Sequence, residues 1–313
     1  MAFQETHVID THIQTINRQF QSTQSLWTHY CGLLSFSPSF VLSENLTPSN
    51  PRMILSKVSH RQKFYTLIHV LVLYAPASSG KARREFFYYV LDTLTSSDLA
   101  IDYQKLIILG DFNYSYQRAN LSSHTSLRWV SYLEETFYNV MQCDDHINIP
   151  TFRRNDEITS IIDYIFISNN LRTAIQSTDI HRLQSSWIDH QLLSLSINLG
   201  LTPTGFGLWL ANPLLMKNKD YRYQLKQRLH HIALQDQWDH IKSETRKFTR
   251  SFAMDYSSWR AKPLKSLQSK RNAFLRSQVP LALRLQCLPI IDQQIESLQQ
   301  ELVEISALKA GIR

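Results

Sequence analysis

Cysteine and long apolar runs are the two features that this 313-residue sequence has little of. Its three cysteines, Cys31, Cys143 and Cys287, lie far apart with no CxxC spacing, which argues against a zinc module and a disulfide framework. No apolar run approaches the roughly 20 residues that span a bilayer, and Met1–Phe20 carries charged residues and histidines in place of a signal-peptide core. We therefore expect a soluble intracellular protein with no membrane attachment, in a location that could include the nucleus.

The formal charge of +7 is concentrated at the C-terminal end of the chain. Residues 1–200 hold 15 Lys/Arg against 17 Asp/Glu, whereas residues 201–313 hold 18 against 9, a net +9. Such asymmetry is typical of a chain that binds nucleic acid or another anionic surface, although a solvated helical tail has the same composition. A joint rich in Gly, Thr and Pro at residues 200–207 separates the two parts. We predict one domain over residues 1–200 and a basic helical extension over 201–313.

The spacing of apolar residues predicts an α/β fold for the first part. Runs rich in β-branched and aromatic residues indicate strands, and apolar residues at three- and four-residue steps indicate helices. Residues 35–52 and the basic run 150–154 are expected to be loops. The predicted strands cover residues 53–58, 64–74, 106–110, 158–168 and 192–199, and the predicted helices cover residues 10–26, 83–99, 126–140, 221–233, 237–254 and 281–308.

The last predicted helix carries the pattern of a helical pair. It is expected to break near Pro289. Beyond that point aliphatic residues recur at three- and four-residue steps, as in an antiparallel hairpin or a short coiled coil: Ile295, Leu298, Leu302 and Ile305. Self-association through residues 292–308 is therefore a further possibility.

Polar residues follow several of the predicted strands directly. The strand at 106–109 ends in a glycine that lets the chain turn, and Asp111 and Asn113, two residues apart, point the same way. Both are also common turn formers, so a plain turn cap is the alternative. Glu5 follows a short N-terminal strand, although it would also suit an exposed position near a helix start. Tyr74 ends the second strand, where it is either a site residue or a strand residue at the rim.

A second set of polar residues lies in the last third of the domain. Asp163 interrupts an apolar strand, and a buried carboxylate is costly unless it has a partner such as His, Arg or a metal. Asp189 and His190 offer one, although a single histidine is more often a surface or core residue. Arg153 and Arg154 have no core role in a loop, so we expect them to contact backbone phosphate. Together the polar residues suit phosphodiester hydrolysis, which needs carboxylates for a hard cation, a base for water and donors for phosphate oxygens.

Five motifs carry a resemblance to a known family. They are QET at residues 4–6, YAP at 74–76, GDFN at 110–113, IDYIFIS at 162–168 and IDH at 188–190. In this order and spacing the chain resembles the endonuclease/exonuclease/phosphatase superfamily, and more closely the apurinic-type endonuclease domain of non-LTR (LINE-like) retrotransposons. The part from residue 207 on is similar to the linker that joins such nucleases to a reverse transcriptase.

The resemblance implies a four-layered α/β sandwich, in which two packed mixed sheets are flanked by helices, and an Mg²⁺- or Mn²⁺-dependent endonuclease that nicks DNA. It implies that Glu5 binds the metal, with Asp189 as a further acidic residue of the metal site. His190 would contact the scissile phosphate and be oriented by Asp163. Two alternatives stay open: an inactive remnant that binds nucleic acid through its basic tail, and a phosphatase for small molecules.

The resemblance assigns the remaining residues to the attack on phosphorus. Asp111 would activate or position water, while Asn113 and Tyr74 would donate hydrogen bonds to phosphate oxygens. Two departures stand out. Ile188 occupies a position where the family commonly has serine, and only four residues precede Glu5, where family members have another strand. We therefore expect the first core strand to be missing, which would expose a neighbouring strand edge and lower both stability and rate.

Overall fold

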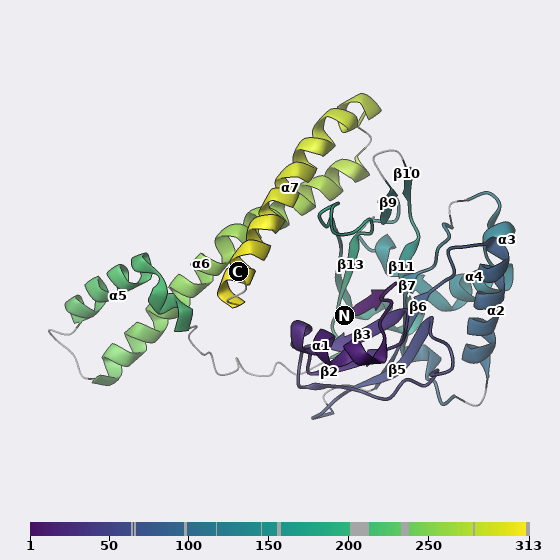
Figure 1. Cartoon of the computed structure of the whole chain (residues 1–313), viewed down its shortest axis with the longest axis horizontal. Helices are drawn as coiled ribbons and strands as arrows, with labels where there is room; N and C mark the ends of the chain where they lie inside the picture. Colours follow the sequence, from purple (N-terminus) through teal and green to yellow (C-terminus); the bar gives the residue numbers. More distant parts are fainter. Residues whose placement is uncertain are drawn as a thin grey trace. The chain divides into compact units, whose positions relative to one another are not determined.

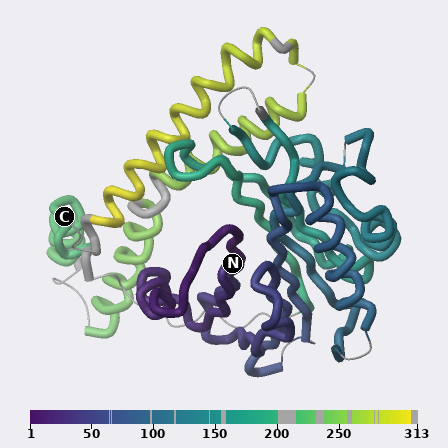
Figure 2. Tube along the Cα trace, turned by 45° about the vertical axis from the view of Figure 1, so that its right-hand side comes forward, coloured from purple at the N-terminus to yellow at the C-terminus, as the bar shows by residue number. Residues whose placement is uncertain are grey.

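The structure is a computed structural model that describes residues 1–313 apart from 64, 66, 97–98, 117, 145, 155–157, 201–212, 233–237, 278 and 311–313. The chain divides into two compact units. The first consists of Met1–Thr202 with Asn272–Pro280, and the second of Pro203–Arg271 with Leu281–Arg313. Figures 1 and 2 trace both units, each of which is described by itself below.

A six-stranded mixed sheet forms the centre of the first unit (Figure 1). Its two middle strands, β6 and β7, are parallel, and every other neighbouring pair is antiparallel. Every residue of β6 is buried, which explains its nearly continuous apolar sequence. The order is β4 (Phe40–Leu42), β5 (Met53–His60), β6 (Ile68–Tyr74), β7 (Leu106–Asp111), β11 (Asp163–Ser168) and β8 (Phe137–Asn139).

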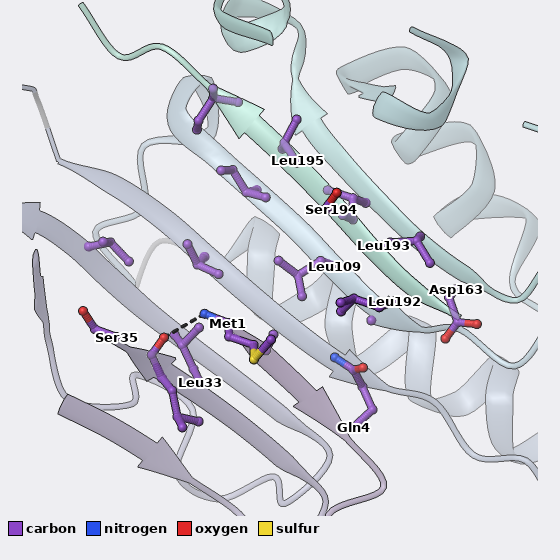
Figure 3. Close-up of a pocket in the computed structure, with 18 of the residues that line it drawn as sticks. Met1, Gln4, Leu33, Ser35, Leu109, Asp163, Leu192, Leu193, Ser194 and Leu195 are labelled. Atoms are coloured by element: carbon purple, nitrogen blue, oxygen red, sulfur yellow. Dashed lines mark hydrogen bonds between the residues drawn. The ribbon is translucent and has the colours of Figure 1, made fainter. Parts of the chain in front are cut away.

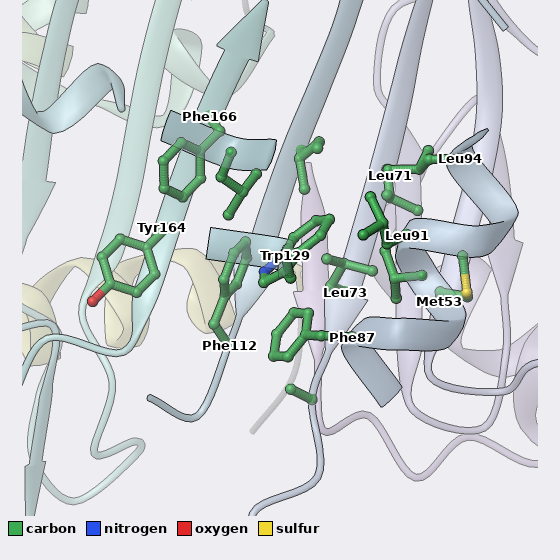
Figure 4. Packing of buried hydrophobic residues seen from close by; sticks show 14 of the residues in the cluster. Met53, Leu71, Leu73, Phe87, Leu91, Leu94, Phe112, Trp129, Tyr164 and Phe166 are labelled. Atoms are coloured by element: carbon green, nitrogen blue, oxygen red, sulfur yellow. The ribbon is translucent and has the colours of Figure 1, made fainter. Parts of the chain in front are cut away.

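Helices α2 (Gly80–Thr95) and α4 (Leu127–Thr136) cover one face of this sheet. Their apolar stripes meet the sheet in an aromatic core, where the rings of Phe87 and Trp129 are stacked with centroids 5.1 Å apart (Figure 4). The ring of Phe112 lies 5.6 Å from that of Phe87 and is fully buried. Since Phe112 directly follows β7, this packing anchors the turn that carries the polar residues.

A second layer of strands covers the opposite face. One sheet has the order β1-β3-β2, and another pairs β12 with β13. Helix α1 (Asp10–Phe20) packs outside this layer, with the ring of Phe20 5.0 Å from that of Phe3. The prediction of packed sheets flanked by helices is therefore confirmed. The strands are β1 (Ala2–Gln4), β2 (Gln24–Trp27), β3 (Cys31–Ser35), β12 (Ile175–His181) and β13 (Leu192–Ile197).

An apolar cavity of about 650 Å³ lies between β1 and β13 (Figure 3). Among the described strands, β1 pairs with β3 alone and β13 with β12 alone, so each presents a free edge. Residues of the central sheet, including Ile107, Leu109 and Ile165, line the cavity together with Leu193 and Leu195. Two unpaired strand edges therefore border this cavity in the part of the chain that the structure describes.

Several predicted elements differ from those in the structure. The helix expected over residues 10–26 ends at Phe20, because Gln21 adopts a left-handed conformation (φ 51°). The Asn17 side chain then accepts hydrogen bonds from Ser25 Oγ and Trp27 Nε1, which holds β2 back against the helix. The expected loop at 35–52 contains β4, and the run 150–154 is not a loop, since it contains β9 (Phe152–Arg154), which pairs with β10 (Ile158–Ser160).

The second unit is helical. Helix α6 is antiparallel to α7, as Figures 1 and 2 show, and Arg271 Nε donates to Asp292 Oδ1 at 2.6 Å in a buried ion pair. The expected break at Pro289 is wrong, since α7 continues through it. Ile295, on which the prediction of self-association depends, is fully buried. None of the helices that the structure describes is long and apolar enough to cross a membrane. The bounds are α5 (Lys219–Ile232), α6 (Trp238–Arg276) and α7 (Leu281–Ala310).

Short helical turns connect these elements. They are α3 (Leu121–His124), η1 (Tyr103–Lys105), η2 (Val140–Gln142), η3 (Asn169–Ala174) and η4 (Pro213–Lys217).

Candidate active site

Two carboxylates face each other across β7 and β11. The antiparallel register places Asp111 opposite Asp163, at the end of the central sheet where both strands are buried. Gly110 is required just before this position, because its φ of +146° disfavours side chains and an added Cβ would lie 1.9 Å from the Leu73 carbonyl oxygen. The close approach of β7 to β6 therefore fixes where the carboxylates stand.

Asp163 has a histidine partner. His190 Nδ1 donates to both carboxylate oxygens, at 3.1 Å and 2.9 Å. Burial disfavours the charged imidazole, but the hydrogen bond and the negative charge of Asp163 outweigh it and raise the pKa of His190 to about 9. His190 is therefore a cation at neutral pH, with Nε2 turned away from Asp163. Asp189, whose side chain is half exposed, lies beside it, with Oδ1 3.9 Å from Nε2.

A buried threonine that the sequence analysis missed holds this pair in place. Thr151 Oγ1 accepts hydrogen bonds from the backbone N–H groups of Ile162 and Asp163, each at 3.1 Å. The next residue, Phe152, packs its ring 5.0 Å from the imidazole of His190. Sequence alone gives no signal for Thr151, because its partners lie 11 and 12 residues further along the chain.

Asp111 is held by the residue that closes its turn. Asn113 is left-handed (φ 54°), and its backbone N–H donates to Asp111 Oδ1 at 2.8 Å. Its side-chain Nδ2 donates to Asp111 Oδ2 at 3.0 Å and to the Ala75 carbonyl at 2.9 Å. Burial, reinforced by the nearby charge of Asp163, raises the pKa of Asp111. Asn113 thus orients a carboxylate whose negative charge is poorly stabilised.

Tyr74 and Glu5 lie next to Asp111. Tyr74 pairs with Asp111 in the parallel register of β6 and β7 and is buried. Burial, followed by the charge of Glu5 and a hydrogen bond with it, raises the pKa of Tyr74 to about 12. The phenol keeps its proton at neutral pH and is a donor. Glu5 is exposed and left-handed (φ 56°).

The arginines of the 150–154 run lie on β9. The backbone N–H of Arg153 donates to the Asp189 carbonyl at 2.9 Å, which fastens β9 to the segment that carries His190. Arg154 is exposed at the end of the strand. Both residues are therefore on a hairpin that adjoins the candidate site.

The donor set fits a hard divalent cation. One atom each of Asp111, Asp163 and His190 lie within 4.8 Å of one another, and because the cationic imidazole keeps both of its ring protons, the two carboxylates are the available ligands. Burial first and the charge of Asp163 second raise the pKa of Asp111, and a cation between the two carboxylates would offset both effects. The resemblance implies that Glu5 and Asp189 belong to the metal site. Within the part of the chain that the structure describes, they lie near this group of three residues but do not belong to it.

No model of a known protein family matches the sequence, and no curated protein matches it. Among solved structures, the chain is similar to a 3′ phosphatase from Neisseria bound to a product DNA hairpin, with 15% identity over 63% of this chain and 88% of that one and a TM-score of 0.45. It is similar to the endonuclease domain of TRAS1, a telomere-specific non-LTR retrotransposon (14% identity, 64% and 79% coverage, TM-score 0.44).

A third similar structure is an AP endonuclease from Archaeoglobus fulgidus (14% identity, 63% and 88% coverage, TM-score 0.49). The chemistry of the site therefore carries the functional assignment.

Proposed function

We propose that this protein is a metal-dependent phosphodiesterase that nicks DNA. The observation that carries the proposal is the meeting of Asp111, Asp163 and His190 at one end of the central sheet, with ligand atoms within 4.8 Å of one another. A buried carboxylate beside a cationic imidazole offers a base and a phosphate-binding donor in the same place.

Each residue has a role that its environment supports. His190, kept cationic by Asp163, donates from Nε2 to a non-bridging phosphate oxygen and offsets the charge that builds in the transition state. Asp111 is the base that accepts a proton from the attacking water, a role that needs its carboxylate to be ionised, as a cation bound beside it would make it. The Tyr74 hydroxyl, which keeps its proton, donates a hydrogen bond to a second phosphate oxygen. Asn113, whose Nδ2 already donates to Asp111 and Ala75, orients the base.

Mg²⁺ or Mn²⁺ would be held by the carboxylate oxygens of Asp111 and Asp163, with Glu5 and Asp189 as neighbouring acids, and when bound it supplies the charge that polarises phosphate and water. A protonated His190 cannot be a ligand, so these oxygens are the donors.

DNA is the proposed substrate because positive charge is concentrated in the C-terminal part of the chain and beside the candidate site. Residues 201–313 carry a net +9, and Arg153 and Arg154 stand on the hairpin beside His190, where they would contact backbone phosphate. The motif resemblance to non-LTR endonucleases supports a retroelement origin.

Nicking of supercoiled plasmid by the purified full-length chain tests the proposal. We expect nicking that requires Mg²⁺ or Mn²⁺ and that falls by about 100-fold or more in Asp111→Ala and in His190→Ala. The exposed residues Asp92 and His12 provide matched controls, and Asp92→Ala and His12→Ala should nick like the unmodified chain. Nicking that persists in both site variants would refute the proposal.

The basic extension favours a second function, binding of nucleic acid without turnover. It would appear as DNA binding that weakens steeply with salt while no divalent metal supports nicking. Hydrolysis of small phosphomonoesters with no cleavage of DNA would instead identify a phosphatase.

A further inference from the structure

A group of rings and one guanidinium adjoins the candidate site on the side of Tyr74. The ring of Tyr30 lies 5.6 Å from that of Tyr74, and Arg52 places its guanidinium 4.2 Å from the Tyr30 centroid and 5.1 Å from the Tyr74 centroid. His29 meets Tyr30 edge to face at 4.5 Å, and His7 lies 5.5 Å from both His29 and Tyr30. The group therefore extends outward from the site without a break.

The backbone beneath these rings is fixed by hydrogen bonds. The backbone N–H of Val8 and the Thr6 hydroxyl both donate to the His29 carbonyl, at 3.0 Å and 3.1 Å. His29 Nδ1 donates to the Val8 carbonyl at 3.2 Å. Glu5 and His7 are both left-handed, a costly conformation that persists only where surrounding contacts impose it. The ring group is thus held in a set arrangement before any ligand arrives.

The exposure of the histidines indicates that the group is a surface for a ligand. A cluster that served only to pack this turn would cover its rings, but His7 and His29 are exposed while Tyr30 and Arg52 are half buried. Flat rings next to a guanidinium bind nucleobases by stacking, and they accept any base because every base has a π-face. A base in a duplex already stacks on its neighbours, so this surface suits an unpaired one.

We propose that His7, His29, Tyr30 and Arg52 form a subsite for an unpaired nucleobase next to the scissile phosphate. This inference rests on the proposed function, because Tyr74 joins the phosphate-binding residues to the ring group and a base bound there belongs to the same strand. DNA that is single-stranded or frayed at the cleavage position is therefore favoured over a continuous duplex.

The test uses a thymidine dodecamer with one central 2-aminopurine, a base whose fluorescence falls when it stacks on an aromatic ring. Titration with the full-length chain in EDTA, which prevents cleavage, should quench the fluorescence. His29→Ala should weaken binding about 5- to 100-fold and remove most of the quenching, whereas His29→Phe keeps a ring and should retain both. Tyr88→Ala, at a 46% exposed tyrosine on α2, is the matched control and should change neither.

Two results would overturn the subsite. One is quenching and affinity in His29→Ala equal to those of the unmodified chain. The other is an equal effect of His29→Ala on a fully paired duplex of the same length, which would contradict the preference for an unpaired base. His7→Asn, which tolerates the left-handed backbone, gives the same comparison should His29→Ala fail to fold. Failure of plasmid nicking with His29-dependent quenching would refute the nuclease and leave the subsite standing.

Discussion

Replacing Asp111 by asparagine should stabilise the metal-free protein at alkaline pH, although it removes a residue of the candidate site. Asp111 is 4% exposed and opposes Asp163 across the sheet. Burial and the charge of Asp163 raise its pKa from 3.8 to about 8, so the folded state resists its ionisation. An acid with a raised folded pKa contributes stability that is fully present below 3.8 and is lost as the pH rises toward 8. Asparagine has no charge, so the variant does not lose this stability as the pH rises.

The size of the change in stability follows from the difference between the folded and the ordinary pKa of Asp111. At 1.36 kcal/mol per pKa unit, the free energy of unfolding should fall by about 3 to 4 kcal/mol between pH 5 and pH 8 through this one group. Asn113 donates one hydrogen bond to each oxygen of Asp111. In the variant one of these oxygens is replaced by an NH₂ group, which cannot accept, so one hydrogen bond is lost at a cost of about 1 to 2 kcal/mol. Counted from below pH 3.8, the loss by pH 8 is about 5 kcal/mol, so the net gain of the asparagine variant at pH 8 is about 3 to 4 kcal/mol.

Urea unfolding in EDTA, followed by tryptophan fluorescence, measures the effect. Trp129 lies in the buried core of the same unit and reports its unfolding. Asp111→Asn should be more stable than the unmodified chain at pH 8 and equal or less stable at pH 5, while Asp92→Asn on the exposed face of α2 should be neutral at both. Added Mg²⁺ should raise the midpoint of the unmodified chain and leave that of Asp111→Asn almost unchanged. An asparagine variant that is less stable by the same amount at both pH values would refute the reasoning.

Two further variants examine neighbouring positions. His190 must stay charged to bind phosphate, so nicking should decline as the pH rises through about 9. Asp163→Asn keeps an oxygen that can accept from Nδ1 but removes the negative charge that raises this pKa, so its residual nicking should decline at a lower pH, closer to the ordinary value of 6.5. An unchanged alkaline limb would contradict that role. Gly110→Ala should lower the free energy of unfolding by more than about 3 kcal/mol, because the new Cβ would lie 1.9 Å from the Leu73 carbonyl oxygen. Urea unfolding measures this change. A midpoint close to that of the unmodified chain would show that β6 and β7 can move apart to make room for the methyl group.

The parts of the fold that the sequence predicts well are those fixed by local pattern. The strand Leu106–Asp111 follows from four consecutive aliphatic residues and a glycine, and both of its faces are indeed covered. Helix α1 was predicted too long because its apolar period continues into β2. The competing signal is tertiary: Asn17 accepts hydrogen bonds from Ser25 and Trp27, which lie beyond the end of the helix.

In the candidate site, too, local sequence pattern predicts some features, whereas others depend on contacts that only the fold creates. The position of Asp163 in an apolar run is a local feature of the sequence and predicts a partner for the carboxylate; in the structure Asp163 begins β11 and its partner is His190. Thr151 could not be found in this way, because its hydroxyl acts on backbone groups that only the fold brings near. The roles of these residues in catalysis stay predictions that the variants above examine.

Asn113 combines the geometry of a turn with direct contacts to the carboxylate of Asp111. The left-handed backbone of Asn113 closes the turn, and the same residue gives Asp111 two hydrogen bonds, one to each carboxylate oxygen. A turn former at this position therefore sets the direction of the carboxylate whose pKa is raised. Since Phe112, between them, is buried in the aromatic core, neither residue can move without disturbing that core. Stability and the geometry of the candidate site are thus carried by the same three consecutive residues.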